Sequence, residues 1–168
     1  YYKQKMELRV LGCFPSWDRI ALVVSKDLAV KSIADIVRRK IPLHVSTRLS
    51  GVDNGTYFTI ATILGFYGFS FEQIKKWGGR VQECGRPFAQ ERMSAIKKRA
   101  LTAIFDEGVS TDGGWLDLAL ANGYEIIPIE PAIVKKLEAM GYSRAFLPKK
   151  RYKQLNQDAL TKIGRAHV

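Results

Sequence analysis

The sequence predicts an α/β protein whose sheet is mostly parallel and is covered by helices on both faces. Short segments rich in valine, isoleucine and leucine alternate with amphipathic helical patterns of modest length. Most of the helical patterns begin or end at a capping residue, a proline or a glycine. Hydrophobic residues make up 46% of the 168 residues, which is enough for a core. The length suits one domain, or one domain with part of another.

Seven segments are predicted to be strands, because they are short and rich in β-branched and aliphatic residues. In chain order they are residues 8–14, 20–25, 43–47, 80–84, 103–105, 124–129 and 144–147. Beyond Pro148 the chain becomes polar and basic, and no clear pattern of secondary structure is visible.

Six helices are predicted between these strands, at residues 32–40, 56–68, 70–77, 88–99, 115–122 and 131–141. Ser32 and Ser70 are the expected N-caps of the first and third. Pro87 and Pro131 are the expected first-turn prolines of two others. Gly123 and Gly141 are expected to end the last two.

The chain carries a net charge of +11, which raises nucleic acid or an anionic surface as a partner. Most of the lysines and arginines stand near the ends of predicted helices, where they complement the helix dipole. No known nucleic-acid-binding module is visible, so we expect no nucleic-acid partner. No run of about 18 apolar residues occurs, so we expect no membrane-spanning segment.

The residues that usually carry metal or covalent chemistry are few and scattered. Cys13 and Cys84 lack metal-ligand spacing, and whether they pair depends on the fold. His44 and His167 are too far apart for a metal site. Ser46 follows His44 on the same face of a strand, but no acid stands near to orient the histidine. We therefore expect no enzyme activity, no metal and no cofactor.

The loop at residues 48–56 (RLSGVDNGT) joins a predicted strand to a helix, and the first N–H groups of a helix bind anions. Gly55 allows close approach to the backbone, and Asn54 or Thr56 can cap the helix or contact a ligand. Arg48 adds a guanidinium suited to a carboxylate. An ordinary capped helix start is the alternative. The loop lacks the spacing of a P-loop or of a dinucleotide-binding motif.

A second polar loop follows the predicted strand at residues 103–105. Asp106 and Glu107 are adjacent, so on an extended chain they point to opposite sides and are not expected to share one substrate. Binding an amine or hydroxyl, or capping a turn, is the expected role. Trp115 is either a pocket wall or part of the core. In open α/β sheets, ligands bind at the carboxyl ends of strands, where both loops are expected.

The order of segments over about residues 8–158 resembles the TAXI family of TRAP-transporter solute-binding receptors. Three stretches carry the resemblance: LRVLGCFPSWDRIALVVSKDLAVKSIADI, VSTRLSGVDNGTYFTIATILGFYGFSFEQI and ALTAIFDEGVSTDGGWLDLALANGYEIIPIEPAIVKKLEAMGY. No single short motif in them is decisive. The loop that in the family commonly reads Gly-Ser-Gly-Thr is matched loosely by residues 49–56.

The resemblance implies a type II periplasmic-binding-protein fold, in which two lobes clamp a small carboxylate or amino acid. Residues 1–29 would be a remnant of the first lobe with a crossing strand, 30–130 the second lobe, and 131–162 a return towards the first. It further implies an extracytoplasmic location and a membrane permease as partner. The resemblance also implies two groups of ligand-binding residues. The group expected to face the anion is Ser46, Thr47, Asn54, Gly55 and Thr56, with Arg48 as a clamp. The weaker candidates, from the second loop, are Asp106, Glu107 and Trp115.

Other classes share this fold. A receptor for thiamine precursors or sulfonates of the ABC type and the effector-binding domain of a transcription regulator stay open as alternatives. A phosphoribosyltransferase should show a glycine-rich pyrophosphate loop, which is not found. The chain begins at Tyr1 without methionine, and residues 163–168 (IGRAHV) match one reading frame of a sequencing adapter. We therefore expect a chain truncated at both ends, with any signal peptide lost.

Overall fold

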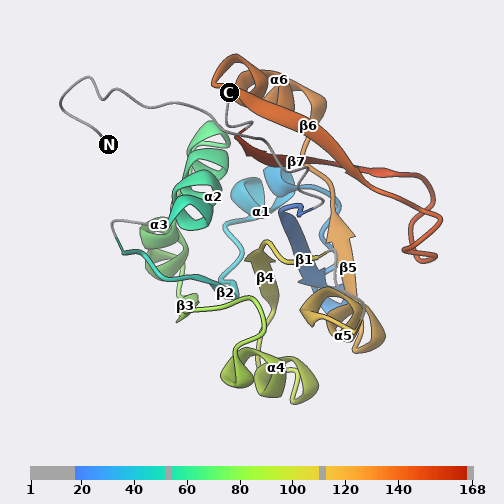
Figure 1. Ribbon diagram of the computed structural model, residues 1–168. Helices are drawn as coiled ribbons and strands as arrows, with labels where there is room; N and C mark the ends of the chain where they lie inside the picture. The colour runs from blue at the N-terminus through green and yellow to red at the C-terminus, as the bar shows by residue number, and fades with distance from the viewer. Residues whose placement is uncertain (1–17, 52–53, 110–112, 166–168) are drawn as a thin grey trace.

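The computed structural model describes residues 18–51, 54–109 and 113–165, and for residues 163–165 it describes the backbone only. A five-stranded sheet of order β3-β2-β4-β1-β5 forms its centre, and β6 and β7 form a separate two-stranded sheet (Figure 1). The α/β class is thereby confirmed. The strands are β1 (Ala21–Ser25), β2 (His44–Arg48), β3 (Arg80–Cys84), β4 (Ala103–Asp106), β5 (Tyr124–Ile127), β6 (Tyr142–Leu147) and β7 (Ala159–Arg165).

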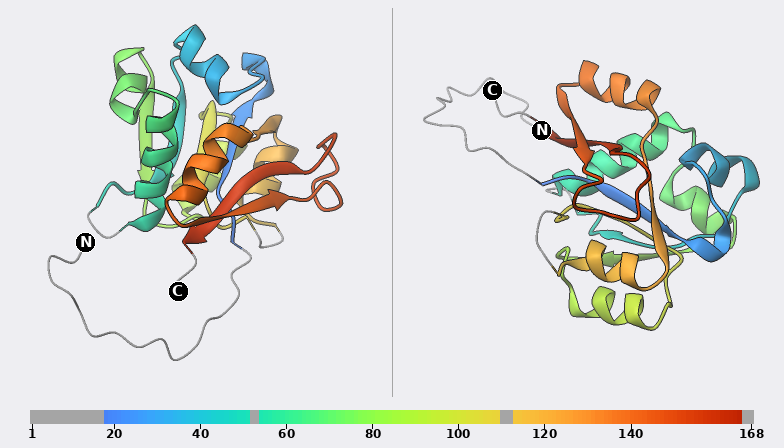
Figure 2. Two further views of the ribbon diagram at one scale, coloured as in Figure 1. Left: turned by 90° about the horizontal axis from the view of Figure 1, so that it is seen from above. Right: turned by 90° about the vertical axis from the view of Figure 1, so that its right-hand side faces the viewer.

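Helices cover both faces of the central sheet (Figure 2). They are α1 (Ile33–Arg39), α2 (Gly55–Phe66), α3 (Phe71–Lys76), α4 (Gln90–Lys97), α5 (Trp115–Ala121) and α6 (Pro131–Ala139), with a short 3-10 helix at Lys26–Leu28. Side chains of α1, α2, α3 and α6 pack in one core with Leu22 and Val24 of β1. Side chains of α4 and α5 pack in a second core with Val23, because successive strand residues face opposite sides.

The sheet is mixed rather than wholly parallel. Strand β2 runs parallel to β3 and β4, whereas β1 is antiparallel to β4 and to β5. Because β4 and β5 both oppose β1, β5 points the same way as β2, β3 and β4. The mostly parallel character is therefore as predicted, and β1 alone in this sheet is reversed.

The helix signals of the sequence are mostly confirmed. The side chains of Ser32 and Ser70 accept hydrogen bonds from the backbone N–H groups three residues on, at 3.1 and 3.2 Å. Pro131 stands in the first turn of α6. Gly123, which follows the C-cap residue Asn122 of α5, has φ of +88°. The prediction for Pro87 is wrong: α4 begins at Gln90, three residues later.

Strand β7 was not predicted from the sequence. It pairs with β6 in antiparallel fashion from Leu147↔Ala159 onward, and the side chains of Thr161 and Lys162 within it are buried. Two buried polar residues in succession break the alternation that identifies a strand, which explains the miss. Its backbone continues through residues 163–165, part of the suspected adapter. The predicted strand at residues 8–14 and Cys13 lie outside the described residues.

The carboxyl ends of β2 and β4 meet at one edge of the central sheet. Asp106 at the end of β4 pairs with Ala21 at the start of β1. Strand β7 reaches this edge as well, since the Ile20 N–H donates to the Lys162 carbonyl at 3.3 Å. Three separate parts of the chain therefore converge where the sequence predicted a ligand. No helix of the described residues has the length and apolar character needed to cross a bilayer.

Candidate anion-binding site

The start of α2 forms one wall of the candidate site. Asn54 caps the helix, and its Oδ1 accepts a hydrogen bond from the Tyr57 N–H at 3.0 Å. The Phe58 N–H donates to the Asn54 carbonyl at 3.1 Å. Within the described part of the chain, the N–H groups of Gly55 and Thr56 have no acceptor. Unpaired N–H groups at the start of a helix attract an anion.

Gly55 stands in open space at this helix start. A Cβ built on it would meet no atom within 4 Å, and the residue is exposed. The absence of a side chain therefore leaves the backbone N–H accessible from outside. This geometry agrees with the predicted role of Gly55, which is to let a ligand approach the main chain.

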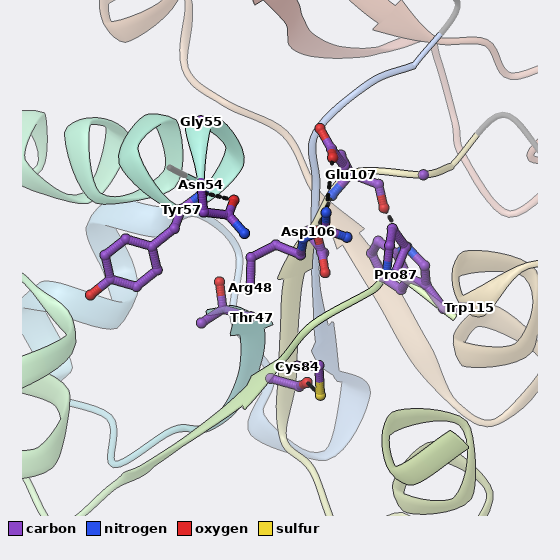
Figure 3. A network of polar contacts seen from close by, with 12 residues as sticks. Thr47, Arg48, Asn54, Gly55, Tyr57, Cys84, Pro87, Asp106, Glu107 and Trp115 are labelled. Carbon is purple, nitrogen blue, oxygen red and sulfur yellow. Dashed lines mark hydrogen bonds and ion pairs between the residues drawn. The ribbon is translucent and has the colours of Figure 1, made fainter. Parts of the chain in front are cut away.

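Thr47, in β2, contributes a buried hydroxyl that has no partner. The side chain is fully buried, and its Oγ1 makes no hydrogen bond to any described residue. Thr47 follows Val45 by two positions and so faces the α2 side of the sheet. Figure 3 shows its hydroxyl turned towards Asn54. A buried hydroxyl without a partner costs about 1–3 kcal/mol, which an anionic ligand oxygen could offset.

Arg48 ends β2 and reaches towards the end of β4 (Figure 3). Its Nε lies 3.9 Å from Asp106 Oδ1, and its Nη2 lies 3.6 Å from Glu107 Oε1. Both distances are too long for hydrogen bonds. The Nε and Nη1 atoms are buried and have no hydrogen-bond partner among the described residues. The guanidinium therefore retains donors that could bind a carboxylate.

Asp106 is neutralised mainly by Arg92 rather than by Arg48. Both side chains are fully buried and form an ion pair. Asp106 Oδ1 also accepts the Glu107 N–H at 2.7 Å. Burial raises the pKa of the Asp106 carboxyl, and the positive charge of Arg92 opposes that rise. Because Asp106 already has these partners, Arg48 remains available to a ligand.

Arg92 also holds the end of β2 in place. Its Nη2 donates to the Thr47 carbonyl at 2.9 Å, and its Nη1 donates to the Pro87 carbonyl at 3.1 Å. Arg92 was not among the residues predicted from the sequence. Its spacing could have indicated burial, because Arg92 stands one helical turn before Ile96 on the apolar face of α4. A charged side chain on such a face needs a buried partner.

Ser46 does not belong to the anion-facing group. Adjacent strand residues face opposite sides, so Ser46 points to α4 while Thr47 points to α2. Its Oγ accepts a hydrogen bond from Arg92 Nε at 2.9 Å and lies 3.5 Å from the Sγ of the buried Cys84. Ser46 therefore orients Arg92 and cannot reach a ligand at the start of α2.

Trp115 is part of the core and not a pocket wall. Its side chain is fully buried, and its Nε1 donates to the Glu107 carbonyl at 2.7 Å. Asp106 and Glu107, which were not expected to share one substrate, both lie within 4.0 Å of Arg48. They can approach one side chain because β4 ends at Asp106, so strand alternation no longer governs Glu107.

Asp18 is a second residue that was not predicted from the sequence. Its Oδ1 accepts hydrogen bonds from the backbone N–H groups of Gly108 at 2.6 Å and Val109 at 3.3 Å. It thus fixes the loop that carries Glu107. Nothing local in the sequence indicates a contact between residues 90 positions apart.

Among the described residues no group of three or more histidine, cysteine or acidic side chains is placed to hold a metal ion. Comparison of the sequence with protein-family models gives no match, and a search of curated proteins gives no similar sequence. The geometry at the carboxyl edge of the sheet is therefore the basis for assigning a function.

Proposed function

We propose that this chain is the ligand-binding part of an extracytoplasmic solute receptor, which captures a small carboxylate or amino acid for a TRAP-type membrane transporter. One observation carries the proposal. The buried donors of Thr47 and Arg48 lack hydrogen-bond partners in the described structure, and these two residues end β2 where Figure 3 draws Asn54 at the start of α2 nearby. A carboxylate would supply oxygen atoms to all three.

The arrangement favours binding over catalysis. Hydroxyl, guanidinium and backbone N–H groups donate hydrogen bonds and hold a negative charge without transferring a proton at neutral pH. Ser46, next to Thr47 in β2 but pointing to the other face of the sheet, already accepts a hydrogen bond from Arg92. Glu107, half-buried beside Arg48, could receive the ammonium group of an amino acid.

The charge of the whole chain supports capture of an anion. A net charge of +11 attracts negatively charged solutes over a Debye length of about 8 Å at physiological ionic strength. Hinge closure of a second lobe over the site would then exclude water and strengthen these hydrogen bonds.

Calorimetric titration of the purified chain tests the proposal. The panel contains acetate, butyrate, alanine and propanesulfonate, each paired with its uncharged amide or alcohol. We expect a carboxylate to bind and its amide not to bind. A sulfonate that binds more tightly than every carboxylate would favour the sulfonate-receptor alternative.

Gly55→Ala separates binding from folding. The new methyl group meets open space, so the variant should melt at or above the temperature of the parent, while the methyl obstructs the anion's approach to the backbone. We expect affinity to fall about tenfold or more. The matched control is Gly65→Ala, also in open space on α2 but near its far end, which should bind like the parent. Equal binding by all three proteins, or no binding of any carboxylate, contradicts the proposal.

A further inference from the structure

Strand β5 forms one edge of the central sheet, and its outer side is unpaired among the described strands (Figure 1). The Lys26 N–H donates to the carbonyl of Gly123, the residue before β5, at 3.0 Å. In an antiparallel pair, opposed residues are hydrogen-bonded at every second position. Counting from this bonded pair, Glu125 and Ile127 bond to β1, so the N–H and C=O groups of Ile126 point away from it.

The backbone of Ile126 lacks hydrogen-bond partners although the residue is buried. Only 9% of the residue is exposed, and neither its N–H nor its C=O bonds to any described residue. The great majority of buried backbone polar groups in proteins are paired. A donor and an acceptor that are both open on one strand edge are the groups to which a further strand adds.

A cavity of about 750 Å³ lies along this edge. Its lining includes Glu125, Ile126 and Pro128 on the β5 side, and residues 154–160, which lead into β7, on the other. A strand of four residues is about 13 Å long, 4.8 Å wide and 10 Å thick, which makes roughly 600 Å³. The cavity therefore has room for one added strand.

One side of the cavity is apolar. Leu120, Ile126 and Leu155 line it and pack with the core that contains α4 and α5. Successive side chains of a strand face opposite sides, so every second side chain of an added strand would face these three residues. Apolar side chains at those positions would gain about 25 cal/mol for each Å² of surface that they bury.

The charges of the cavity differ between its two ends. Lys26 is exposed and lies at the amino end of β5, because its backbone bonds to the residue before this strand. Glu130 and Asp158 lie at the other end, each within two residues of the hydrogen bond from the Ile129 N–H to the Leu160 carbonyl, 3.0 Å long. An added strand antiparallel to β5 would place its carboxyl end near Lys26 and its amino end near the acids. Two other charged side chains line the cavity, Lys31 and Glu125.

We infer that the cavity beside β5 binds an extended peptide, which adds to the central sheet as a strand antiparallel to β5. The peptide has apolar side chains at alternate positions, a basic amino end and an acidic carboxyl end. A helix would not serve, because its backbone groups are already bonded to one another. The peptide site is separate from the anion-binding site at the ends of β2 and β4 and does not depend on the proposed function.

Selection from a display library of random octapeptides on the purified chain tests the inference. We expect the enriched sequences to alternate apolar residues between a basic amino end and an acidic carboxyl end. Calorimetric titration then compares the best peptide with two N-methylated forms. Methyl groups on the amides that face β5 remove its hydrogen-bond donors, so affinity should fall about tenfold or more. Methyl groups on the intervening amides, which point away from β5, should change the affinity little.

Gln157→Trp tests the same site from the side of the protein. Gln157 is exposed and lines the cavity, so the indole should obstruct the groove without entering the core. We expect peptide affinity to fall about tenfold or more. The matched control is Lys153→Trp, on the same connection but outside the cavity lining, which should bind like the parent. Lys26→Glu should change the selected residue at the carboxyl end of the peptide from acidic to basic.

Several results would overturn the inference. It is wrong if the selection enriches no peptide, if Gln157→Trp binds the best peptide like the parent, or if the two N-methylated forms bind equally. It is also wrong if the parent is a dimer in size-exclusion chromatography and Gln157→Trp is a monomer, because the edge would then pair with a second copy. Gly55→Ala should bind the peptide like the parent, so that a failure of carboxylate binding leaves this inference standing.

Discussion

At the scale of single residues, the buried polar groups at the carboxyl edge fall into two kinds. Ser46, Arg92 and Asp106 satisfy one another inside the protein. Thr47 Oγ1 and the Arg48 donors face the same region with no hydrogen-bond partner in the described structure. The unpaired donors of Thr47 and Arg48 do not stabilise the folded state, because a buried donor without a partner costs free energy. Such groups are expected where a ligand completes the hydrogen bonding.

Thr47→Val should therefore raise stability and weaken binding. The substitution replaces an unpaired buried hydroxyl with a methyl group of nearly the same size, so we expect the free energy of unfolding to rise by about 1 kcal/mol. Affinity for the carboxylate should fall several-fold, because the ligand loses a hydrogen bond. Urea unfolding and calorimetric titration measure the two effects.

Thr59→Val is the matched control for this prediction. Thr59 Oγ1 already donates to the Gly55 carbonyl at 2.8 Å and lies 3.3 Å from the Tyr142 hydroxyl. Its loss should lower the free energy of unfolding by about 1 kcal/mol. If Thr47→Val destabilises the protein as much as Thr59→Val does, the Thr47 hydroxyl is satisfied within the protein and is not waiting for a ligand.

At the scale of elements, local signals account for most of the agreement between sequence and structure. Asn54, Ser32 and Ser70 cap helices at the positions their side chains favour, because capping depends on residues three apart. Pro87 was misplaced because a proline before a helix also suits a turn, and here α4 begins after such a turn. The reversed direction of β1 depends on pairing between distant strands, which no local pattern encodes.

Asn54→Ala should lower stability and also perturb ligand binding. Loss of the cap is expected to reduce the free energy of unfolding by about 1 kcal/mol. It also leaves the Tyr57 N–H unpaired and loosens the turn that presents the N–H groups of Gly55 and Thr56. We therefore expect a several-fold loss of affinity, measured by calorimetric titration beside a thermal melt.

Ser70→Ala removes a comparable cap from α3, where the serine Oγ accepts the Gln73 N–H at 3.2 Å. It should cost a similar free energy and leave the affinity unchanged. Equal loss of affinity in the two variants would mean that binding follows general stability, and that the α2 N-terminus has no special part in it.

At the scale of the whole molecule, the edge of the sheet that holds the candidate site was predictable, and the full set of residues gathered there was not. The rule that ligands bind at the carboxyl ends of strands identified Arg48, Asn54, Gly55 and Glu107 from local sequence. Arg92 holds the Thr47 carbonyl and Lys162 packs on the Tyr142 ring through contacts that only the complete fold creates. Buried charges of this kind are set by topology, so hydrophobic patterning along the chain does not reveal them.

The linkage between protonation and folding allows the burial of Lys162 to be measured on the whole molecule. Burial lowers its pKa to about 8 from the ordinary value of 10.5. Between these two pH values the unfolded chain binds a proton that the folded chain does not, so the contribution of Lys162 to stability rises with pH. Below about pH 8 both states are protonated, and the full cost of about 3 kcal/mol is present.

The difference in unfolding free energy between the parent and Lys162→Met isolates this effect, because all other titrations cancel. The variant should be more stable than the parent at pH 7, and its advantage should shrink as the pH rises from 8 towards 10.5. Urea unfolding at closely spaced pH values measures it. Lys136→Met is the control, since the Lys136 ammonium lies 5.3 Å from the Phe66 ring but on an exposed residue that water solvates. A parent–variant difference that stays constant with pH would show that Lys162 is hydrated in the folded protein.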